Sequence, residues 1–453
     1  MRHPASYRDP SGFIFKKDGK LYRQINPVFF EDYEFCLKQN IYQKLQAKNW
    51  LVDHKEISRD ANAIILQPEP IDFISYPYEW SYTQYKHAAQ LTLRIQLFLL
   101  ENNCSLKDSS AFNVTFHDGK AIFIDTLSIE PYRENQPWRA LKQFSEHFLA
   151  PLFMAQKYGS RHLKTLQHQI NGCDLNEIKQ HLGMKDRFNP VLHSHIKLLA
   201  QDGNSKLKSA SGIAVFAKLS KSDQVKILKV LDGYISKMEL KENTEWSAYY
   251  DEINYDQKSF ELKKQLIEHW SSDLGLKKAV DLGGNDGTFG DLIMNQMDQV
   301  MVCDIDQSAV DQCYRNHLKS GKIHSLVTDL LQPAPAIGFE NQERDSFIDR
   351  LISWQPDLSM ALALIHHLTL TGNVPFEMSA AFFARLSPYL IIEFPDRDDS
   401  WVKFILDSKR DARHLFDFYG VDAFAKAYQQ LYTILKSEKI EGTERTLFLM
   451  QKK

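Results

Sequence analysis

The stretch AVDLGGNDGTFG, residues 279–290, decides the fold of the C-terminal half of the chain. It begins as a short apolar strand, passes through a loop with glycines at 283, 284 and 287, and enters a helix near Thr288. Glycine in such a loop permits positive φ in a tight turn and close approach of the backbone to a ligand. The spacing differs from the Gly-x-Gly-x-x-Gly fingerprint of dinucleotide-binding proteins. The stretch therefore predicts a strand–loop–helix unit, and its glycines fit either a nucleotide-binding loop or an ordinary structural turn.

Short apolar strands and helices alternate regularly after this stretch. Such alternation predicts a parallel sheet that is covered by helices on both faces. The chain ends with two extended runs, residues 431–440 and 446–450, which the turn Glu441-Gly-Thr-Glu444 joins. We therefore expect an α/β fold whose sheet finishes in an antiparallel hairpin.

Polar residues follow several of these predicted strands. The runs VMVCDID (residues 300–306), HSLVTDL (324–330), MALALIHHL (360–368) and YLIIEF (389–394) end in acids or histidines. In an open α/β sheet, ligands bind outside the carboxyl ends of the strands, so these side chains should converge there. An acid about twenty residues after the glycine loop, here Asp304, can accept hydrogen bonds from both hydroxyls of a ribose.

The glycine loop resembles motif I of class I S-adenosylmethionine-dependent methyltransferases, in which an acid is followed by Gly-x-Gly-x-Gly. Asp281 matches the acid, Gly283 and Gly287 match the outer glycines, and Asn285 replaces the middle one. Asparagine tolerates the left-handed conformation better than most residues, so the departure is mild. The resemblance implies a Rossmann-like methyltransferase sheet of seven strands within residues 246–453.

The same resemblance implies S-adenosylmethionine as the cofactor and suggests which residues bind it. Asp304 would hold the ribose, and Asp329 would hold the adenine amino group with help from the backbone amide that follows. The full set of implied cofactor-binding residues is Asp281, Gly283, Gly284, Asn285, Gly287, Asp304, Ile305, Asp329 and Leu330.

Methyl transfer from a sulfonium mainly needs positioning of the acceptor and sometimes a base. His366 and His367 follow the fourth strand of the predicted sheet and are candidate bases. For each histidine alone, a structural role in the pocket wall is the favoured interpretation. Glu393, at the end of the fifth strand, is a candidate for contact with the acceptor. A tyrosine cluster at residues 249, 250 and 255 is either a lid over the cofactor or an ordinary packing element.

The acceptor is less well indicated than the cofactor. The chain lacks the Asn-Pro-Pro-Tyr signature of amino-group methylation at nucleobases or glutamine, and also the paired cysteines of RNA cytosine methylation. These absences favour an oxygen of a small molecule, a sugar or a polymer. Over nearly its full length the chain resembles a group of bacterial methyltransferases related to a host-specific nodulation protein.

The N-terminal half contains a second motif, in LKDSSAFN (residues 106–113) and AIFID (121–125). It resembles the core of kinase-like phosphotransferases, in which Asp108 would be the catalytic aspartate and Asn113 and Asp125 the Mg²⁺ ligands. Arg23, in the predicted hairpin of residues 12–25, stands where a phosphate-pairing lysine belongs. The resemblance implies ATP and Mg²⁺ at this site.

Several residues depart from the kinase-like pattern. Leu106 replaces the usual histidine, Thr126 and Leu127 replace Phe-Gly, and the hairpin contains no Gly-x-Gly-x-x-Gly. An ordinary hairpin loop with Asx-turn residues is the alternative. We expect an α+β, kinase-like region at residues 1–135 and a mainly helical region at residues 136–245, ahead of the methyltransferase domain.

Composition sets limits on the class of protein. The 453 residues suggest two or three domains, and 43% hydrophobic with 25% charged residues is typical of a globular protein. A net charge of -3 indicates no general attraction to nucleic acid or to an anionic membrane. The five cysteines form no CxxC pair, which favours a reducing compartment and argues against a zinc site. We therefore expect a cytoplasmic protein with no membrane segment and no structural metal.

Three hypotheses follow from the sequence. The first is a methyltransferase that acts on an acceptor such as a small molecule or sugar. The second is a bifunctional protein with kinase-like and methyltransferase activities. The third is a non-catalytic scaffold that binds S-adenosylmethionine or a nucleotide.

Overall fold

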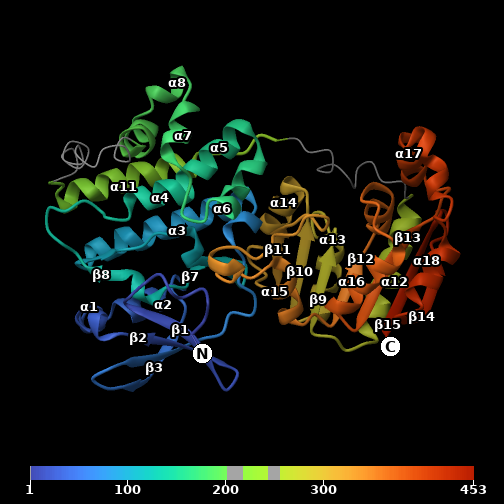
Figure 1. The fold of residues 1–453 in the computed structure, drawn as a ribbon, viewed down its shortest axis with the longest axis horizontal. Helices are drawn as coiled ribbons and strands as arrows, with labels where there is room; N and C mark the ends of the chain where they lie inside the picture. The colour runs from blue at the N-terminus through green and yellow to red at the C-terminus, as the bar shows by residue number, and fades with distance from the viewer. Residues whose placement is uncertain (1, 201–217, 243–255) are drawn as a thin grey trace. The chain divides into compact units, whose positions relative to one another are not determined.

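The structure described here is a computed structural model that covers residues 2–200, 218–242 and 256–453 (Figure 1). The chain folds into two compact units. Unit 1 comprises Met1–Glu242 together with Ala336–Asp345, and unit 2 comprises Asn243–Pro335 together with Ser346–Lys453. The three-domain division expected from the sequence, with limits at residues 135 and 245, stays a prediction.

Unit 2 is built on a sheet of seven strands in the order β11-β10-β9-β12-β13-β15-β14. The first five in this order are parallel, and β15 is antiparallel to both of its neighbours. The predicted seven-stranded sheet and its final antiparallel hairpin are thus confirmed. The strands are β9 (Lys278–Leu282), β10 (Gln299–Asp304), β11 (Ile323–Val327), β12 (Leu358–Ala361), β13 (Tyr389–Pro395), β14 (Tyr432–Lys439) and β15 (Arg445–Lys452).

Helices connect these strands, and polar side chains at the helix starts fix several of their boundaries. Asp256, Asp306, Ser346 and Asp399 each accept a hydrogen bond from a backbone N–H of the first turn that follows. The helices of unit 2 are α12 (Gln257–Ser272), α13 (Thr288–Ile293), α14 (Gln307–His317), α15 (Phe347–Trp354), α16 (Phe376–Leu386), α17 (Ser400–Ser408) and α18 (Val421–Tyr428).

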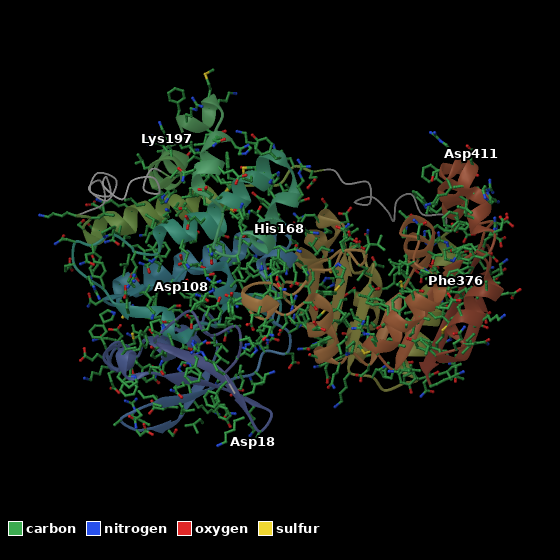
Figure 2. All side chains as sticks on the ribbon, in the orientation of Figure 1. Asp18, Asp108, His168, Lys197, Phe376 and Asp411 are labelled. Carbon is green, nitrogen blue, oxygen red and sulfur yellow. The ribbon has the colours of Figure 1, made fainter. Side chains whose placement is uncertain are left out.

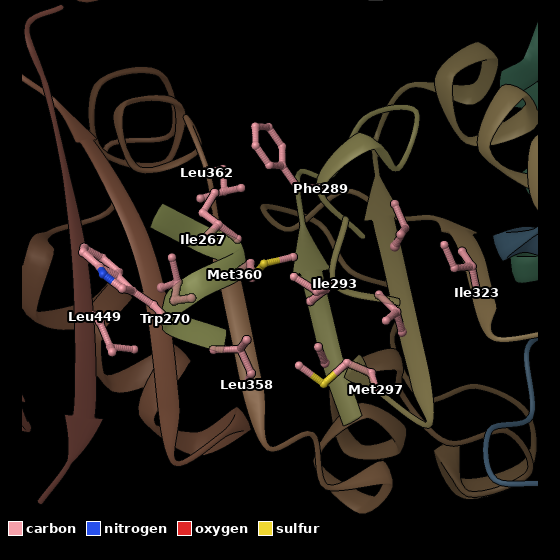
Figure 3. Packing of buried hydrophobic residues seen from close by; sticks show 14 of the residues in the cluster. Ile267, Trp270, Phe289, Ile293, Met297, Ile323, Leu358, Met360, Leu362 and Leu449 are labelled. Carbon is pink, nitrogen blue, oxygen red and sulfur yellow. The ribbon is translucent and has the colours of Figure 1, made fainter. Parts of the chain in front are cut away.

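One face of the sheet packs against α12 and α13 through a buried apolar cluster (Figure 3). Alternate residues of a strand point to the same face, as Val300 and Val302 of β10 and Leu358 and Met360 of β12 do in this cluster. The members from the strands are Ala279, Val300, Val302, Ile323, Leu358, Met360, Ile391, Leu447 and Leu449. Ile267 and Trp270 of α12 and Phe289 and Ile293 of α13 cover them. This packing fixes the start of α13 close above β9 and β10.

Unit 1 begins with an antiparallel sheet in the order β1-β2-β4-β3. The expected hairpin is confirmed by β1 (Gly12–Lys17) and β2 (Lys20–Ile25), and its turn residues Asp18 and Gly19 both have positive φ. Such a turn matches the twist of the strands it joins. The other strands of this sheet are β3 (His54–Arg59) and β4 (Ile64–Pro68), and α1 (Phe30–Lys38) and α2 (Ile41–Gln46) lie between β2 and β3 in the chain.

The long helix α3 (Tyr82–Glu101) is the centre of the rest of unit 1. A reciprocal pair of hydrogen bonds between Ser81 and Gln84 caps its first turn, and most of its residues are buried. It packs against β5 (Cys104–Leu106), β7 (Lys120–Phe123), α5 (Ala150–Tyr158) and α11 (Lys221–Ser236). The other elements are β6 (Val114–His117), β8 (Ile129–Pro131), α4 (Leu141–Phe144), α6 (Thr165–His168), α7 (Leu175–Gln180), α8 (Met184–Arg187) and α9 (Pro190–Leu192).

Residues 336–345 follow β11 in the chain but belong to unit 1. Glu343 anchors this segment: its side chain is 1% exposed and accepts hydrogen bonds from Arg8 Nε at 2.6 Å and from the Tyr7 hydroxyl at 3.0 Å. Burial raises the pKa of Glu343, but the hydrogen bonds from Arg8 outweigh burial and hold the pKa below its ordinary value. Arg344 lies over the ring of Phe112, 4.7 Å from its centroid.

Glu343→Gln is expected to loosen this segment, because the substitution removes the charge that pairs with Arg8. We expect a loss of about 1–2 kcal/mol, since Arg8 is half exposed and the pair is partly screened. The stabilisation should be present above the ordinary pKa of glutamate and vanish as the pH falls through the lowered pKa. Amide hydrogen exchange of residues 336–345 should speed up several-fold. The exposed Glu340→Gln should leave it unchanged, and equal exchange in both variants would contradict the anchor role.

Two further observations concern the described residues as a whole. None of their helices is long and apolar enough to cross a membrane. All five cysteines are buried and free.

Candidate active site

The loop between β9 and α13 adopts the conformations that its glycines suggest. Gly283 and Gly287 have φ of 76° and 85°, and Asn285 has φ of 50°. Asn285 thus takes the left-handed conformation that its substitution for the middle glycine requires. The amides of Gly283 and Gly284 donate to the Cys303 carbonyl oxygen at 2.8 and 3.1 Å, which ties the loop to the end of β10.

At two positions of the loop, Gly284 and Gly287, neighbouring atoms also leave no room for a Cβ atom. A Cβ at Gly284 would lie 2.8 Å from the Asp281 carboxyl carbon, and a Cβ at Gly287 would lie 2.5 Å from Cys313 Sγ. Gly290, one turn into α13, would bring a Cβ to 2.8 Å from Val302. The glycines therefore allow the loop and the first turn of α13 to lie directly against β10 and α14.

Gly287→Ala is expected to lower the free energy of unfolding of unit 2 by about 2–4 kcal/mol. The added Cβ combines left-handed strain with overpacking against Cys313. Gly275→Ala is a matched control, because Gly275 also has positive φ but faces open space, and it should lose only about 1 kcal/mol. Denaturant dependence of hydrogen exchange in β9 and β10 measures both. Equal losses in the two variants would show that Cys313 imposes no steric limit.

A pocket opens at the carboxyl edge of the sheet. Among the residues named from the sequence, it is lined by Asp281, Gly283, Gly284, Asn285, Asp304, Ile305, Asp329, Leu330 and His367. Gly287 lies outside it, in a separate shallow groove, and His366 and Glu393 do not line it. The sequence analysis missed Phe260, Lys263, Phe289, Thr328, Leu331, Leu362, Ala363, Leu364, Leu368 and Thr371. The tyrosine cluster at residues 249, 250 and 255 lies outside the described residues.

Asp304 connects the glycine loop to the rim of this pocket. Its carboxylate accepts hydrogen bonds from the backbone amides of Asn285 and Asp306, each at 2.8 Å. Burial raises its pKa to about 6 despite these hydrogen bonds. The carboxylate is therefore fixed in place by two backbone donors and keeps oxygen lone pairs for a ligand.

Asp281 lies deeper, at the end of β9, and is fully buried. Within the described residues, neither of its carboxylate oxygens accepts a hydrogen bond. Burial raises its pKa to about 7, and the nearby Asp304 and Asp286 add to the rise while Lys263 opposes it. A buried carboxyl group without hydrogen bonds is costly, so a cationic ligand group in the pocket would relieve it.

Glu393 lies behind the pocket wall in a network of buried charges. It is fully buried, accepts from Lys263 Nζ at 3.0 Å, and lies 3.6 Å from the guanidinium of Arg445. Arg445 in turn donates to Asp399 at 2.7 Å. Glu393 is thus a partner of Lys263 and Arg445 in this structure, and its role as a catalytic group stays a prediction.

The two histidines differ in their access to the pocket. His367 begins the short helical turn His367–Thr371 and lines the pocket, whereas His366 is 2% exposed and does not line it. Their rings lie close together, with centroids 4.1 Å apart. Burial lowers the pKa of His367 to about 4 and lowers that of His366 strongly, with Arg445 adding to both shifts. Both rings are therefore neutral at pH 7.

The four kinase-like residues also come together, inside unit 1, where Figure 2 marks Asp108. Arg23 and Ser128 both donate to the Asp125 carboxylate. Asn113 Nδ2 donates to Ser128 Oγ at 3.4 Å and also forms a hydrogen bond with Asp108. Burial raises the pKa of Asp108, and the charge of Asp125 raises it further. The four residues that the sequence analysis singled out in unit 1 thus form one cluster of side chains.

The side chains of this cluster do not by themselves form a metal-binding site among the described residues. In the part of the chain that the structure describes, no group of three or more His, Cys, Asp or Glu side chains is arranged to hold a metal ion. The Asp125 carboxylate is instead neutralised by Arg23, and desolvation of Asp125 is outweighed so that its pKa is lowered.

Comparisons with known proteins found solved structures that align with part of the chain and a curated relative that aligns with all of it. No family model matches it. The N-methyltransferase NodS from Bradyrhizobium japonicum WM9 aligns with 44% of this chain and 98% of its own, at 12% identity and a TM-score of 0.32. Magnesium protoporphyrin IX methyltransferase from Synechocystis PCC 6803 aligns with 45% of this chain and 89% of its own, at 14% identity and a TM-score of 0.29.

A curated relative extends over both units. The nodulation protein NoeA from Rhizobium meliloti (strain 1021) is 29% identical over 465 residues, which span 100% of this chain and 96% of that protein. Unit 2 has the seven strands and the final antiparallel hairpin that the motif I resemblance implied. The chain as a whole is therefore similar to the nodulation protein NoeA, and its unit 2 contains a seven-stranded sheet that ends in an antiparallel hairpin.

Proposed function

We propose that unit 2 transfers a methyl group from S-adenosylmethionine to an acceptor at the carboxyl edge of its sheet. The observation that carries this proposal is the convergence of Asp281, Asp304 and the glycine loop on one pocket. The buried carboxyl of Asp281, which accepts no hydrogen bond among the described residues, fits the ammonium group at the amino-acid end of this cofactor. When bound, the cofactor supplies a methyl group that its sulfonium already activates.

The residues of the pocket have distinct roles in this proposal. Asp304 accepts hydrogen bonds from the ribose hydroxyls, and Asp329 accepts one from the adenine amino group. The exposed side chains of Ile305 and Leu331 and the partly exposed Leu330 provide apolar surface for the base. Together these contacts orient the cofactor and exclude water from its reactive end.

His367 is the candidate base for the acceptor. Its ring is neutral at pH 7, so a nitrogen can accept the proton that a hydroxyl acceptor loses as its oxygen is methylated. The fully buried Glu393 does not face the pocket and is not needed for this step. An oxygen of a small molecule or sugar is the acceptor that we propose.

Transfer of a tritiated methyl group tests the proposal. The full chain, incubated with methyl-labelled S-adenosylmethionine and a panel of oligosaccharides, phenols and carboxylic acids, should label at least one acceptor. His367→Phe should reduce the rate about 100-fold while leaving cofactor binding intact, which is the effect typical of a general base. Tight cofactor binding without any label would favour a non-catalytic scaffold.

A second candidate function concerns unit 1, where Asp108, Asn113, Asp125 and Arg23 cluster. We propose that this cluster binds the phosphates of ATP together with Mg²⁺, for which carboxylate and amide oxygens are suitable ligands. Titration of the full chain with ATP, with and without Mg²⁺, tests it. Binding that needs Mg²⁺ and is lost in Asp125→Asn supports the site, and binding of neither form excludes it.

A further inference from the structure

Lys263 was not indicated by any motif, yet it lies at the wall of the pocket. It belongs to α12, and its side chain is 4% exposed. Among the described residues, Lys263 is the only lysine or arginine that lines the pocket. Three carboxylates, those of Asp281, Asp304 and Asp329, line it as well. Among the described residues, the pocket thus offers a single ammonium group beside three carboxylates, and its other lining residues are neutral polar or apolar.

The ammonium group of Lys263 is held firmly in place. Its Nζ donates to Glu393 Oε2 at 3.0 Å and lies 4.6 Å from the centroid of the Phe289 ring. Glu393 also faces Arg445, which binds Asp399, and Asp399 caps the first turn of α17. Burial lowers the pKa of Lys263, and Glu393 opposes this shift by favouring the charged form. An ammonium has three donors, so Lys263 can bind a second anion without leaving Glu393.

The charges of the pocket match the two ends of an adenosyl amino acid. The adenosine end needs acceptors for its hydroxyls and amino group, and Asp304 and Asp329 provide them. The amino-acid end carries an ammonium and a carboxylate, which need an anion and a cation respectively. Asp281 suits the ammonium, because it is a buried carboxyl without hydrogen bonds. Lys263 is then the side chain whose charge suits the carboxylate.

We propose that Lys263 binds the carboxylate of the cofactor's amino-acid end and makes the pocket selective for adenosyl ligands that carry this group. The inference rests on the proposed function, because it assumes that the pocket binds S-adenosylmethionine. Glu393 and Arg445 are positioning residues in it, since they hold Lys263 and do not line the pocket. Selectivity for the cofactor's carboxylate then comes from Lys263 of α12, which belongs neither to the glycine loop nor to the ends of the strands.

Calorimetric titration of the full chain with three ligands tests the inference. S-Adenosylhomocysteine carries both charged groups, its decarboxylated analogue lacks the carboxylate, and 5′-methylthioadenosine lacks the whole amino-acid end. Wild-type protein should bind S-adenosylhomocysteine at least tenfold more tightly than the decarboxylated analogue. Lys263→Met should abolish this ratio while changing the affinity for 5′-methylthioadenosine less than threefold, which also shows that the pocket is intact.

Two further variants keep the test decisive. The double variant Lys263→Met, Glu393→Gln also removes the buried charge of Glu393, which loses its partner when Lys263 is replaced. It should show the same loss of selectivity as Lys263→Met. Lys258→Met is the matched control, because Lys258 lies on the same helix with a side chain 78% exposed, and it should behave as wild type. Equal wild-type affinity for S-adenosylhomocysteine and its decarboxylated analogue would overturn the inference, as would selectivity that survives in Lys263→Met. Failure of the wild type to bind any of the three ligands would instead refute the proposed function.

Discussion

Asp304→Ala should weaken the binding of S-adenosylhomocysteine by roughly 100-fold or more. The substitution removes a charged acceptor that two ribose hydroxyls would share, and each such hydrogen bond contributes about 1.5–3 kcal/mol. It also frees the amide of Asn285, which Asp304 holds at 2.8 Å in the glycine loop. The effect therefore combines a lost ligand contact with a loosened loop. Calorimetric titration of the wild type and the variant measures the ratio of the two affinities.

The control for this variant is an aspartate just before the first residue of β10, whereas Asp304 is the last residue of that strand. Asp298 precedes β10, is exposed, and does not line the pocket. Asp298→Ala should bind S-adenosylhomocysteine as the wild type does. If Asp304→Ala retained wild-type affinity, the assignment of Asp304 to the ribose would be wrong, whatever the fold of unit 2.

The affinity for S-adenosylhomocysteine should also fall steeply as the pH drops below 7. Burial raises the pKa of Asp281 to about 7 and that of Asp304 to about 6, so both carboxyls take up protons in this range when the pocket holds no ligand. A cationic ammonium beside Asp281 favours the ionised form, so binding must release a proton. At pH 6 this amounts to about one proton from Asp281, and the affinity changes up to tenfold per pH unit.

The stability of the folded protein depends on pH in the opposite direction to its affinity for the ligand. A carboxyl whose pKa is raised on folding stabilises the folded protein at low pH, and this contribution is lost as the pH rises through the raised pKa. As the pH falls below 7, the raised pKa values of these carboxyls therefore stabilise the folded, unliganded protein, while its affinity for the ligand falls. Titrations between pH 5.5 and 8, in buffers with different heats of ionisation, measure the proton release. Asp281→Asn should remove most of it, and a pH-independent affinity in the wild type would exclude an ionisable Asp281 at the ligand.

The parts of the fold that could be predicted from the sequence were those with local signals. The run from Ala279 to Gly290 contains both the apolar strand and the glycines, and the conformation of Asn285 follows from its residue type. The turn at Asp18 and Gly19 and the final hairpin are signalled in the same way. The position of Asp304 followed from its place at a strand end, because parallel strands bring their carboxyl ends to one edge.

The parts that could not be predicted depend on residues far apart in the chain. Lys263 stands among other charged residues of α12, where lysine usually marks a solvated face, and only the fold brings it to Glu393, 130 residues away. Glu343 is likewise held by Arg8, 335 residues away, so nothing near it shows that residues 336–345 belong to unit 1. The adjacent His366 and His367 have the same residue type, and only the backbone geometry decides which one lines the pocket.

The cluster of Arg23, Asp108, Asn113 and Asp125 could be predicted only in part, and its kinase-like role stays a prediction. The order of Asp108, Asn113 and Asp125 could be read from the sequence, and the structure brings the three residues together. The ion pair between Arg23 and Asp125 depends on packing of the first hairpin against the later segment, which no local pattern shows.

Calorimetric titration of the full wild-type chain with S-adenosylmethionine and S-adenosylhomocysteine tests the proposed function most directly. We expect one site per chain in unit 2 with micromolar affinity, equivalent to about -8 kcal/mol. Binding of both ligands at this site, in competition with each other, would support a methyltransferase pocket. Absence of binding of either ligand at millimolar concentration would contradict the assignment, even though the sheet has the expected order of strands.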